Sequence, residues 1–218
     1  QLARHKPATV NLRIAAMLSY CKFARIPMRL KAVKMPTRTS IDNVITPEQL
    51  SALLRGLARD NNRAWYVNIK LLTNTGMRIS EALRITKRDL MLGSVTMHTK
   101  DHMREIIFPD NLLDEIHDDI SRLSAGDLIL RGIKGKPITS EQSFRVSLTR
   151  IADRYGVPRI VAHPHGFRHF YAVEFLKRKH DIAKLADLLG HKDINMTRIY
   201  LRQTQASLKE TVNNVVDW

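Results

Sequence analysis

The chain has 218 residues, enough to bury one substantial hydrophobic core together with a small appendage. Its 36 Lys and Arg outnumber its 21 Asp and Glu, and the resulting formal net charge of +15 favours a polyanionic partner such as nucleic acid. Cys21 is the single cysteine, which excludes an intrachain disulfide and a cysteine-based zinc cluster and fits a reducing, intracellular compartment. No apolar stretch approaches the roughly 18 residues of a membrane span, and the N-terminus has no signal-peptide pattern.

The first 40 residues are strongly basic. They contain no acidic residue and the following basic ones: Arg4, Lys6, Arg13, Lys22, Arg25, Arg29, Lys31, Lys34 and Arg38. A solvated arm and a surface that contacts nucleic acid both remain open for such a run. Within it, Pro7 opens a helical pattern with one apolar stripe, made of Val10, Ile14, Met17, Leu18 and Cys21. This helix needs a partner and the chain starts at Gln1, so we expect a fragment that lacks an N-terminal portion.

Residues 27–45 have no sustained period and are rich in Pro, Lys and Thr, which predicts an extended basic linker. Thr46, Pro47 and Gln49 then supply an N-cap, a first-turn proline and a residue that can close a capping box. The sequence therefore predicts three parts: the end of one domain (1–26), a linker (27–45) and a second domain (46–218).

The second domain is predicted to be mainly α with a small antiparallel β-hairpin, an α+β fold. Helices are expected at 64–75, ending at Gly76, and at 79–83. Residues 93–109 alternate between apolar and polar, which predicts a hairpin with a turn at Asp101 and His102 and with Lys100 near its tip. Further helices are expected at 112–123, 140–155, 166–177, 182–189 and 204–216.

The densest polar cluster lies at residues 163–169. His165 and Arg168 are three residues apart, so on a helix they share one face. An ordinary surface turn is one alternative. A zinc site on the three histidines is another, although their spacing is not that of a helical zinc motif and no acidic ligand is adjacent.

Three further positions carry chemical interest, each with an ordinary structural alternative. Glu81 follows Arg78 by three residues, so its carboxylate either holds the Arg78 guanidinium group in place or forms an ordinary surface ion pair with it. His191 follows Gly190 at the end of a helix, where a histidine often only interacts with the helix dipole. Tyr200 lies between two apolar residues, where a tyrosine is usually part of the core.

Together these residues resemble the tyrosine recombinases, also called the phage integrase family. The signature of that family is an Arg in a TGxRxxE-type segment, a Lys on a β-hairpin, an HxxR box, an LGH and a terminal Tyr. The chain has these in order: Arg78, Lys100, His165 with Arg168, Leu189-Gly190-His191 and Tyr200. The resemblance covers residue 45 to the C-terminus, and the helix at 8–24 resembles the last helix of the family's core-binding domain. Lys87 and Arg104 also lie near the hairpin, so Lys100 is the loosest of these assignments.

The resemblance implies a role for each residue. Arg78 and Arg168 would clamp the scissile phosphate, because guanidinium groups are planar, bidentate and always charged. Tyr200 would be the nucleophile, His165 the general acid and base, and His191 a hydrogen-bond donor to the phosphate or to Tyr200. Lys100 would protonate the leaving 5′ oxygen, and Glu81 would hold Arg78 or a histidine in place.

The implied activity is site-specific DNA recombination or integration through a 3′-phosphotyrosyl intermediate, with no metal, ATP or other cofactor. The implied partner is double-stranded DNA, bound by a homotetramer on two duplexes, with no membrane and no small-molecule substrate. The basic arm would contact the DNA backbone through these residues: Arg13, Lys22, Arg25, Arg29, Lys31, Lys34 and Arg38. The implied location is the cytoplasm, on the nucleoid, in a prokaryote, virus or mobile element. A type IB topoisomerase, a catalytically inactive DNA-binding relative and a metal nuclease remain as alternatives.

Overall fold

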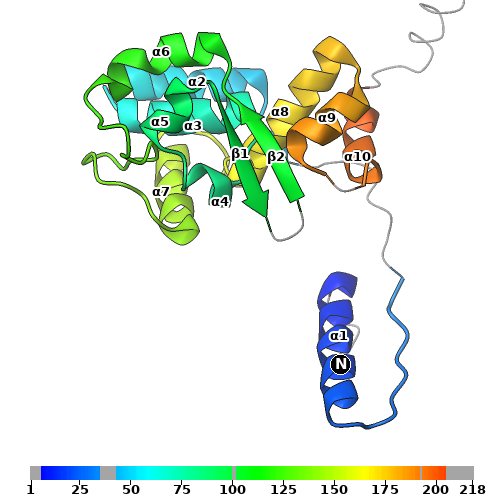
Figure 1. The fold of residues 1–218 in the computed structure, drawn as a ribbon. Coiled ribbons are helices and arrows are strands. Elements are labelled where there is room, and N and C mark those ends of the chain that lie inside the picture. Colours follow the sequence, from blue (N-terminus) through cyan, green and yellow to red (C-terminus); the bar gives the residue numbers. More distant parts are fainter. Residues whose placement is uncertain (1–5, 35–42, 100–101, 192, 205–218) are drawn as a thin grey trace, which may run out of the picture. The chain divides into compact units, whose positions relative to one another are not determined.

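The computed structural model describes residues 6–34, 43–99, 102–191 and 193–204. By its contacts the chain divides into two compact units, Gln1–Thr39 and Ser40–Trp218. Figure 1 shows the helices and strands of both units. In the ranges just given, no helix is both long and apolar enough to cross a membrane.

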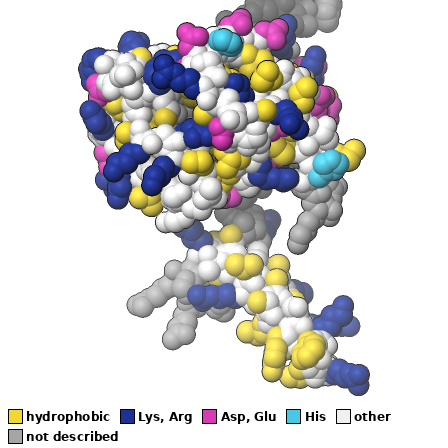
Figure 2. Space-filling model, turned by 60° about the vertical axis from the view of Figure 1, so that its left-hand side comes forward, with side chains coloured by type: hydrophobic (Ala, Val, Ile, Leu, Met, Phe, Trp, Pro, Cys, Tyr) yellow, Lys and Arg dark blue, Asp and Glu magenta, His cyan; other side chains and the backbone are white. Residues whose placement is uncertain are grey.

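The first unit is built on one helix, α1 (Pro7–Phe23), which begins at a proline as predicted. The chain then turns back, and Asn11 holds the returning segment: Val33 N donates to Asn11 Oδ1 at 2.7 Å, and Asn11 Nδ2 donates to Val33 O at 2.9 Å. Val10 and Cys21 are buried, whereas Tyr20 and Phe23 are 66% and 88% exposed. Figure 2 shows hydrophobic side chains on the surface of this unit.

The second unit is mainly helical with a two-stranded antiparallel sheet, so the predicted fold class is confirmed. Its elements in chain order are α2 (Pro47–Arg59), α3 (Arg63–Thr75), α4 (Ile79–Ala82), α5 (Lys87–Met91), β1 (Ser94–Thr99), β2 (His102–Ile107), α6 (Asp110–Ser121), α7 (Glu141–Arg154), α8 (Pro164–Lys179), α9 (Ile182–Leu189) and α10 (Asn195–Thr204). Helix α3 packs against α2, α6 and α8, and α10 packs against α8 and α9 (Figure 1).

Local signals set several of the boundaries. The capping box predicted at the start of α2 is present: Gln49 N donates to Thr46 Oγ1 at 3.2 Å, and Thr46 N donates to Gln49 Oε1 at 3.0 Å. Helix α3 ends at Gly76, which has the left-handed conformation of a C-cap, as expected. Gly76 therefore sets the direction in which the chain leaves α3 and enters the segment that carries Arg78.

The predicted hairpin at 93–109 is confirmed as β1 and β2, with Ser94 paired to Ile107 and Met97 paired to Arg104. His102 was expected in the turn but is the first residue of β2. Residues 100 and 101 lie outside the described residues, and with them the Lys100 assignment. On β2 the side chains alternate, because Arg104 and Ile106 are buried whereas Met103 and Ile107 are exposed. A charged residue thus occupies an inward position of the sheet.

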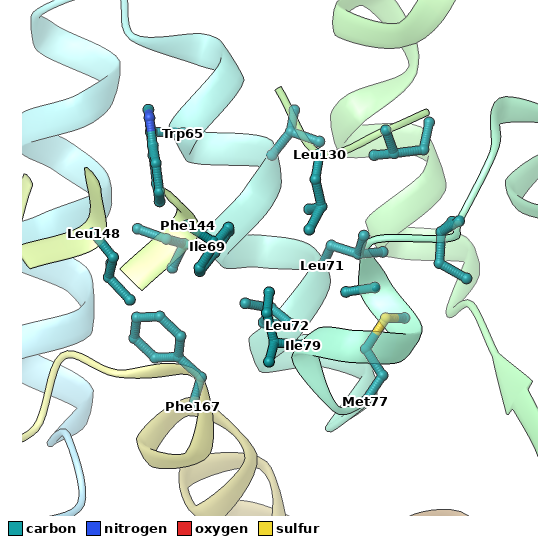
Figure 3. Close-up of a cluster of buried hydrophobic side chains, with 14 of the residues drawn as sticks. Trp65, Ile69, Leu71, Leu72, Met77, Ile79, Leu130, Phe144, Leu148 and Phe167 are labelled. Carbon is teal, nitrogen blue, oxygen red and sulfur yellow. The ribbon is translucent and has the colours of Figure 1, made fainter. Parts of the chain in front are cut away.

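The core of this unit is one large apolar cluster around α3 (Figure 3), in which Trp65 and Phe144 have ring centroids 5.0 Å apart. A second, smaller cluster joins α8, α9 and α10. Its buried members are Ala172, Val173, Leu176, Leu185, Leu189 and Tyr200. This second cluster fixes the helix that carries Tyr200 against α8, which carries His165 and Arg168, and against α9, which precedes His191.

Two helices were not predicted. No helix was expected across Tyr200, which lies in α10, or at α5. Helix α10 has Met, Thr, Ile and Tyr in its first two turns, so its intrinsic helix propensity is modest. It forms because it packs against α8 and α9. The helix expected at 204–216 lies outside the described residues beyond Thr204.

Candidate active site

The candidate site is organised by the C-terminal end of α9. The last carbonyl groups of a helix have no partner within it and carry the negative end of its dipole. Three arginines from three different elements donate to three consecutive carbonyl groups there. The pairs are Arg104 Nη1 to Leu188 O at 2.7 Å, Arg168 Nη2 to Leu189 O at 2.6 Å and Arg78 Nη2 to Gly190 O at 3.4 Å. The helix end therefore gathers guanidinium groups that are far apart in sequence.

Gly190 is required at this helix end for two reasons. Its φ of +62° is left-handed, and a Cβ at this position would overlap Arg104 Cδ. The turn then continues into His191, whose backbone N donates to Ala186 O at 3.0 Å. The LGH motif is thus a helix cap that makes room for one arginine and places a histidine beside it.

Arg168 lies in the first two turns of α8 and is 3% exposed. Besides Leu189 O, its guanidinium donates through Nη1 to Gly76 O at 2.8 Å, so it joins the end of α3 to the end of α9. Burial, together with the positive charges of Arg78 and Arg104, lowers the pKa of Arg168 to about 9. A bound anion would oppose both effects.

Glu81 is the acid that balances part of this charge. It accepts hydrogen bonds from Arg78 N at 2.6 Å, from Arg78 Nη1 at 3.1 Å and from Arg104 Nη2 at 2.6 Å. The Glu81 and Arg104 side chains are 6% and 5% exposed, and Arg104 Nε is buried with no hydrogen-bond partner among the described residues. Three guanidinium groups against one carboxylate leave two positive charges in excess at the end of α9.

Tyr200 is 2% exposed, and its ring packs in the cluster between α8, α9 and α10. Its hydroxyl oxygen lies 2.8 Å from Nδ1 of His169, a hydrogen bond whose direction depends on the imidazole tautomer. Burial raises the pKa of the Tyr200 hydroxyl, and Arg168 partly offsets this. The hydroxyl is therefore protonated at neutral pH and sits against a possible proton acceptor.

The three histidines of the 163–169 segment have different surroundings. His163 caps α8, where Gly166 N donates to its Nδ1 at 2.9 Å. His165 is exposed, and its ring lies 5.3 Å from that of His169. Burial of its inner side, and then Arg168, lower the pKa of His165. In the part of the chain that the structure describes, no group of three or more His, Cys, Asp or Glu side chains is arranged to hold a metal ion.

His191 links the arginine cluster to α10, because its Nδ1 lies 2.7 Å from Oγ1 of the buried Thr197. Burial lowers the pKa of His191 to about 4, and the nearby Arg168 and Arg78 contribute in the same direction. The imidazole is thus neutral at neutral pH, and it can both donate and accept a hydrogen bond.

This shift predicts a pH dependence of stability. In the unfolded chain a histidine takes up a proton near pH 6.5, whereas folded His191 stays neutral until about pH 4. Between these values the unfolded state binds more protons, so the free energy of unfolding should fall as the pH falls from 6.5 towards 4. Burial shifts His163 and His165 in the same direction. Urea midpoints at pH 7.5, 6 and 5 should decrease in this order, and less steeply for His191→Gln. Equal slopes for the two proteins would contradict the assignment to His191.

Most of the residues singled out in the sequence meet at this site. The second unit brings together Arg78, Glu81, His165, Arg168, His191 and Tyr200. Lys100 lies outside the described residues, as does Arg38 of the basic arm. The other arm residues that were expected to contact DNA are exposed on the first unit: Arg13, Lys22, Arg25, Arg29, Lys31 and Lys34.

Two residues of the cluster were not predicted to belong to it. Arg104 was noted only for its place near the hairpin. Its inward position on the sheet, opposite Met97 and on the same face as Ile106, could have indicated a role, because a buried charge requires a partner. His169 was not assigned either. It lies four residues after His165, so both share one face of α8. The same kind of spacing, three residues, had indicated that Arg168 lies beside His165.

Comparison with known proteins agrees with this arrangement. The model of the phage integrase family matches residues 43–207. Tyrosine recombinase XerA of Pyrococcus furiosus is 30% identical over 214 residues, which are 94% of this chain and 73% of that protein. The crystal structure of a XerA recombinase matches with a TM-score of 0.63 at 20% identity, over 97% of this chain and 77% of that one. A XerH recombinase bound to difH substrate in a pre-cleavage complex matches with a TM-score of 0.64 at 23% identity, over 94% of this chain and 64% of that one. The resemblance found in the sequence is thereby confirmed: the chain belongs to the phage integrase family of tyrosine-type site-specific recombinases.

Proposed function

We propose that this chain cuts and rejoins DNA at specific sites through a covalent intermediate in which Tyr200 is joined to a 3′-phosphate. The observation that carries the proposal is the cluster of Arg78, Arg104 and Arg168 around one helix end, packed beside the helix of Tyr200. Its excess of two positive charges is offset when a phosphodiester binds. More negative charge gathers on the phosphate oxygens in the transition state, so the same groups stabilise that state more than the ground state.

Arg78 and Arg168 have different roles because their side chains differ in exposure. The Arg78 side chain is 36% exposed and only loosely bound to Gly190 O, so it is the guanidinium that contacts the phosphate oxygens. Arg168 is buried and already donates to two carbonyl groups. It contributes its charge from within the site and holds the ends of α3 and α9 at a fixed separation.

The reaction needs two proton transfers and no metal or ATP. Tyr200 Oη attacks phosphorus, its proton passes to a histidine of α8, and the bond to the 5′ oxygen breaks. Lys100 protonates that oxygen, while His191 donates to the phosphate or orients Tyr200. Because the phosphotyrosyl ester retains the energy of the phosphodiester, attack by a 5′ hydroxyl reverses the step and joins strands.

The rest of the chain holds the DNA. We propose that residues 1–26 end a core-binding domain, that 27–45 form the linker and that 46–218 form the catalytic domain. The exposed basic residues of the first unit contact DNA phosphates, which makes binding salt-dependent. A related XerH recombinase is bound to its difH substrate in solved structures. A homotetramer on two duplexes completes the proposal.

The test is covalent capture in the absence of metal ions. The purified chain is incubated in EDTA with half-site DNA that carries a nick near the cleavage position, so that the cut fragment diffuses away and religation cannot occur. We expect a protein-DNA adduct that survives denaturing electrophoresis. Cleavage that requires Mg²⁺ and leaves no adduct would contradict the proposal and favour a metal nuclease.

The same preparation separates the remaining alternatives. A recombinase joins strands from two DNA molecules that each carry a site, whereas a type IB topoisomerase relaxes a supercoiled plasmid and exchanges no partners. DNA binding without adduct would indicate a catalytically inactive relative. The comparison with the Xer recombinases favours strand exchange.

A further inference from the structure

His169 is the residue that the Tyr200 hydroxyl contacts. The distance from His169 Nδ1 to Tyr200 Oη is 2.8 Å, and the two ring centroids are 5.6 Å apart. His165, which the family resemblance makes the general acid and base, lies one helical turn earlier, with its ring 5.3 Å from that of His169 and edge-on to it. His169 therefore stands between His165 and the proposed nucleophile.

We propose that His169 is the catalytic residue that accepts the Tyr200 proton during strand cleavage and returns it during rejoining. In this step the Tyr200 O–H bond breaks as the bond from Oη to phosphorus forms, and the proton moves to Nδ1 of neutral His169. The bond from phosphorus to the 5′ oxygen breaks at the same time, and that oxygen takes its proton from Lys100. The inference rests on the proposed function and deepens it.

Tyr200 needs such an acceptor more than an exposed tyrosine would. At pH 7, a hydroxyl with a pKa near 10 is a free phenolate only about one time in a thousand, and burial raises the pKa of Tyr200 above its ordinary value. A proton acceptor already in hydrogen-bond contact removes the need for a free phenolate. His169 is half-buried beside the ring, so it fulfils this geometric requirement without a movement of α8.

His165 is then available for a different contact. It is exposed at the first turn of α8, whereas His169 faces Tyr200 from the second turn. An exposed imidazole near Arg78 and Arg168 is placed to donate a hydrogen bond to a phosphate oxygen. The two histidines thus serve the two reactants: His165 the phosphate and His169 the tyrosine.

The test compares two substitutions at one position. In His169→Asn the amide takes the place of Nδ1 and accepts a hydrogen bond from Tyr200, but it cannot take a proton; in His169→Leu both functions are lost. The rate of adduct formation in EDTA at saturating DNA should fall by roughly 100-fold or more in both variants. The dissociation constant for DNA should stay within about twofold, and thermal melting should confirm that both variants fold. His180→Asn, the same change at the C-cap of α8, should keep the wild-type rate, because Asn tolerates the left-handed conformation found there.

A modified substrate identifies which proton is involved. With sulfur in place of the bridging 5′ oxygen, the leaving group departs without protonation, so the defect of His169→Asn should persist. Full recovery on this substrate, or a wild-type rate of His169→Asn on ordinary DNA, would overturn the inference. In either case the wild-type adduct would leave the proposed function standing. A wild-type chain that forms no adduct on either substrate would refute both.

Discussion

Tyr200→Phe is expected to form no covalent adduct with half-site DNA, a loss of roughly 10⁴-fold or more in the rate of cleavage. The substitution removes the one atom that attacks phosphorus in the proposed mechanism and keeps the ring that packs between α8, α9 and α10. The measurement is adduct formation in EDTA, followed over hours by denaturing electrophoresis. A persistent adduct would mean that another residue is the nucleophile.

The fold of this variant should remain intact, so that the loss can be attributed to chemistry. Tyr200→Phe gives up one partly buried hydrogen bond, the contact with His169, which corresponds to about 1 kcal/mol in the free energy of unfolding. DNA affinity should not fall, because the hydroxyl makes no contact with the DNA backbone before the attack in this scheme. Tyr155→Phe is the matched control: it removes a similar hydrogen bond, from Tyr155 to Asp60 at 3.0 Å, outside the site, and should keep the wild-type rate.

The helices and the hairpin of the second unit could be predicted because their signals are local. The capping box at Thr46, the left-handed glycines at 76 and 190 and the alternation along β2 each involve neighbouring residues only. Helix α10 could not be predicted in this way. Its order depends on burial of Tyr200 and Thr197 against α8 and α9, which no window of its own sequence contains.

The site was predictable in its members but not in its geometry. The motifs indicated Arg78, Arg168, His191 and Tyr200, since each has a characteristic neighbour in the sequence. What holds the arginines together is a set of backbone carbonyl groups at the end of α9. Every residue has a backbone carbonyl group, so the sequence does not indicate which three accept hydrogen bonds from the arginines.

For Arg104, the position could be inferred from the sequence but the partner could not. Its inward position on β2 could be inferred from alternation, but its partner Glu81 lies 23 residues earlier in a different element. From the sequence, Glu81 was expected to hold Arg78 or a histidine, and not Arg104. The structure shows that one carboxylate holds two guanidinium groups, and this shared contact makes Glu81 the residue whose loss should have the widest consequences.

Glu81→Gln is therefore expected to lower the free energy of unfolding by about 3–5 kcal/mol, the cost of leaving a buried charge without its partner. The amide oxygen can still accept one hydrogen bond, but its NH₂ group turns a donor towards Arg78 or Arg104. The double variant Glu81→Gln with Arg104→Met should lose less than the sum of the two single variants, because it removes the unpaired charge as well. Asp153→Asn, which breaks the exposed pair with Arg159, is the control and should change little. Urea unfolding of the five proteins, wild type included, measures these differences.

The activity of Glu81→Gln separates orientation from charge. Without the carboxylate the site carries three positive charges in excess instead of two, so DNA should bind at least as tightly as to the wild type. The rate of adduct formation at saturating DNA should nevertheless fall, because the amide keeps at most one of the two contacts that fix the backbone and the guanidinium group of Arg78. Tighter binding with slower chemistry is the signature of a group that orients the arginine for the transition state. If affinity and rate fell together, Glu81 would instead serve to hold the fold, and the orientation of Arg78 would depend on the end of α9 alone.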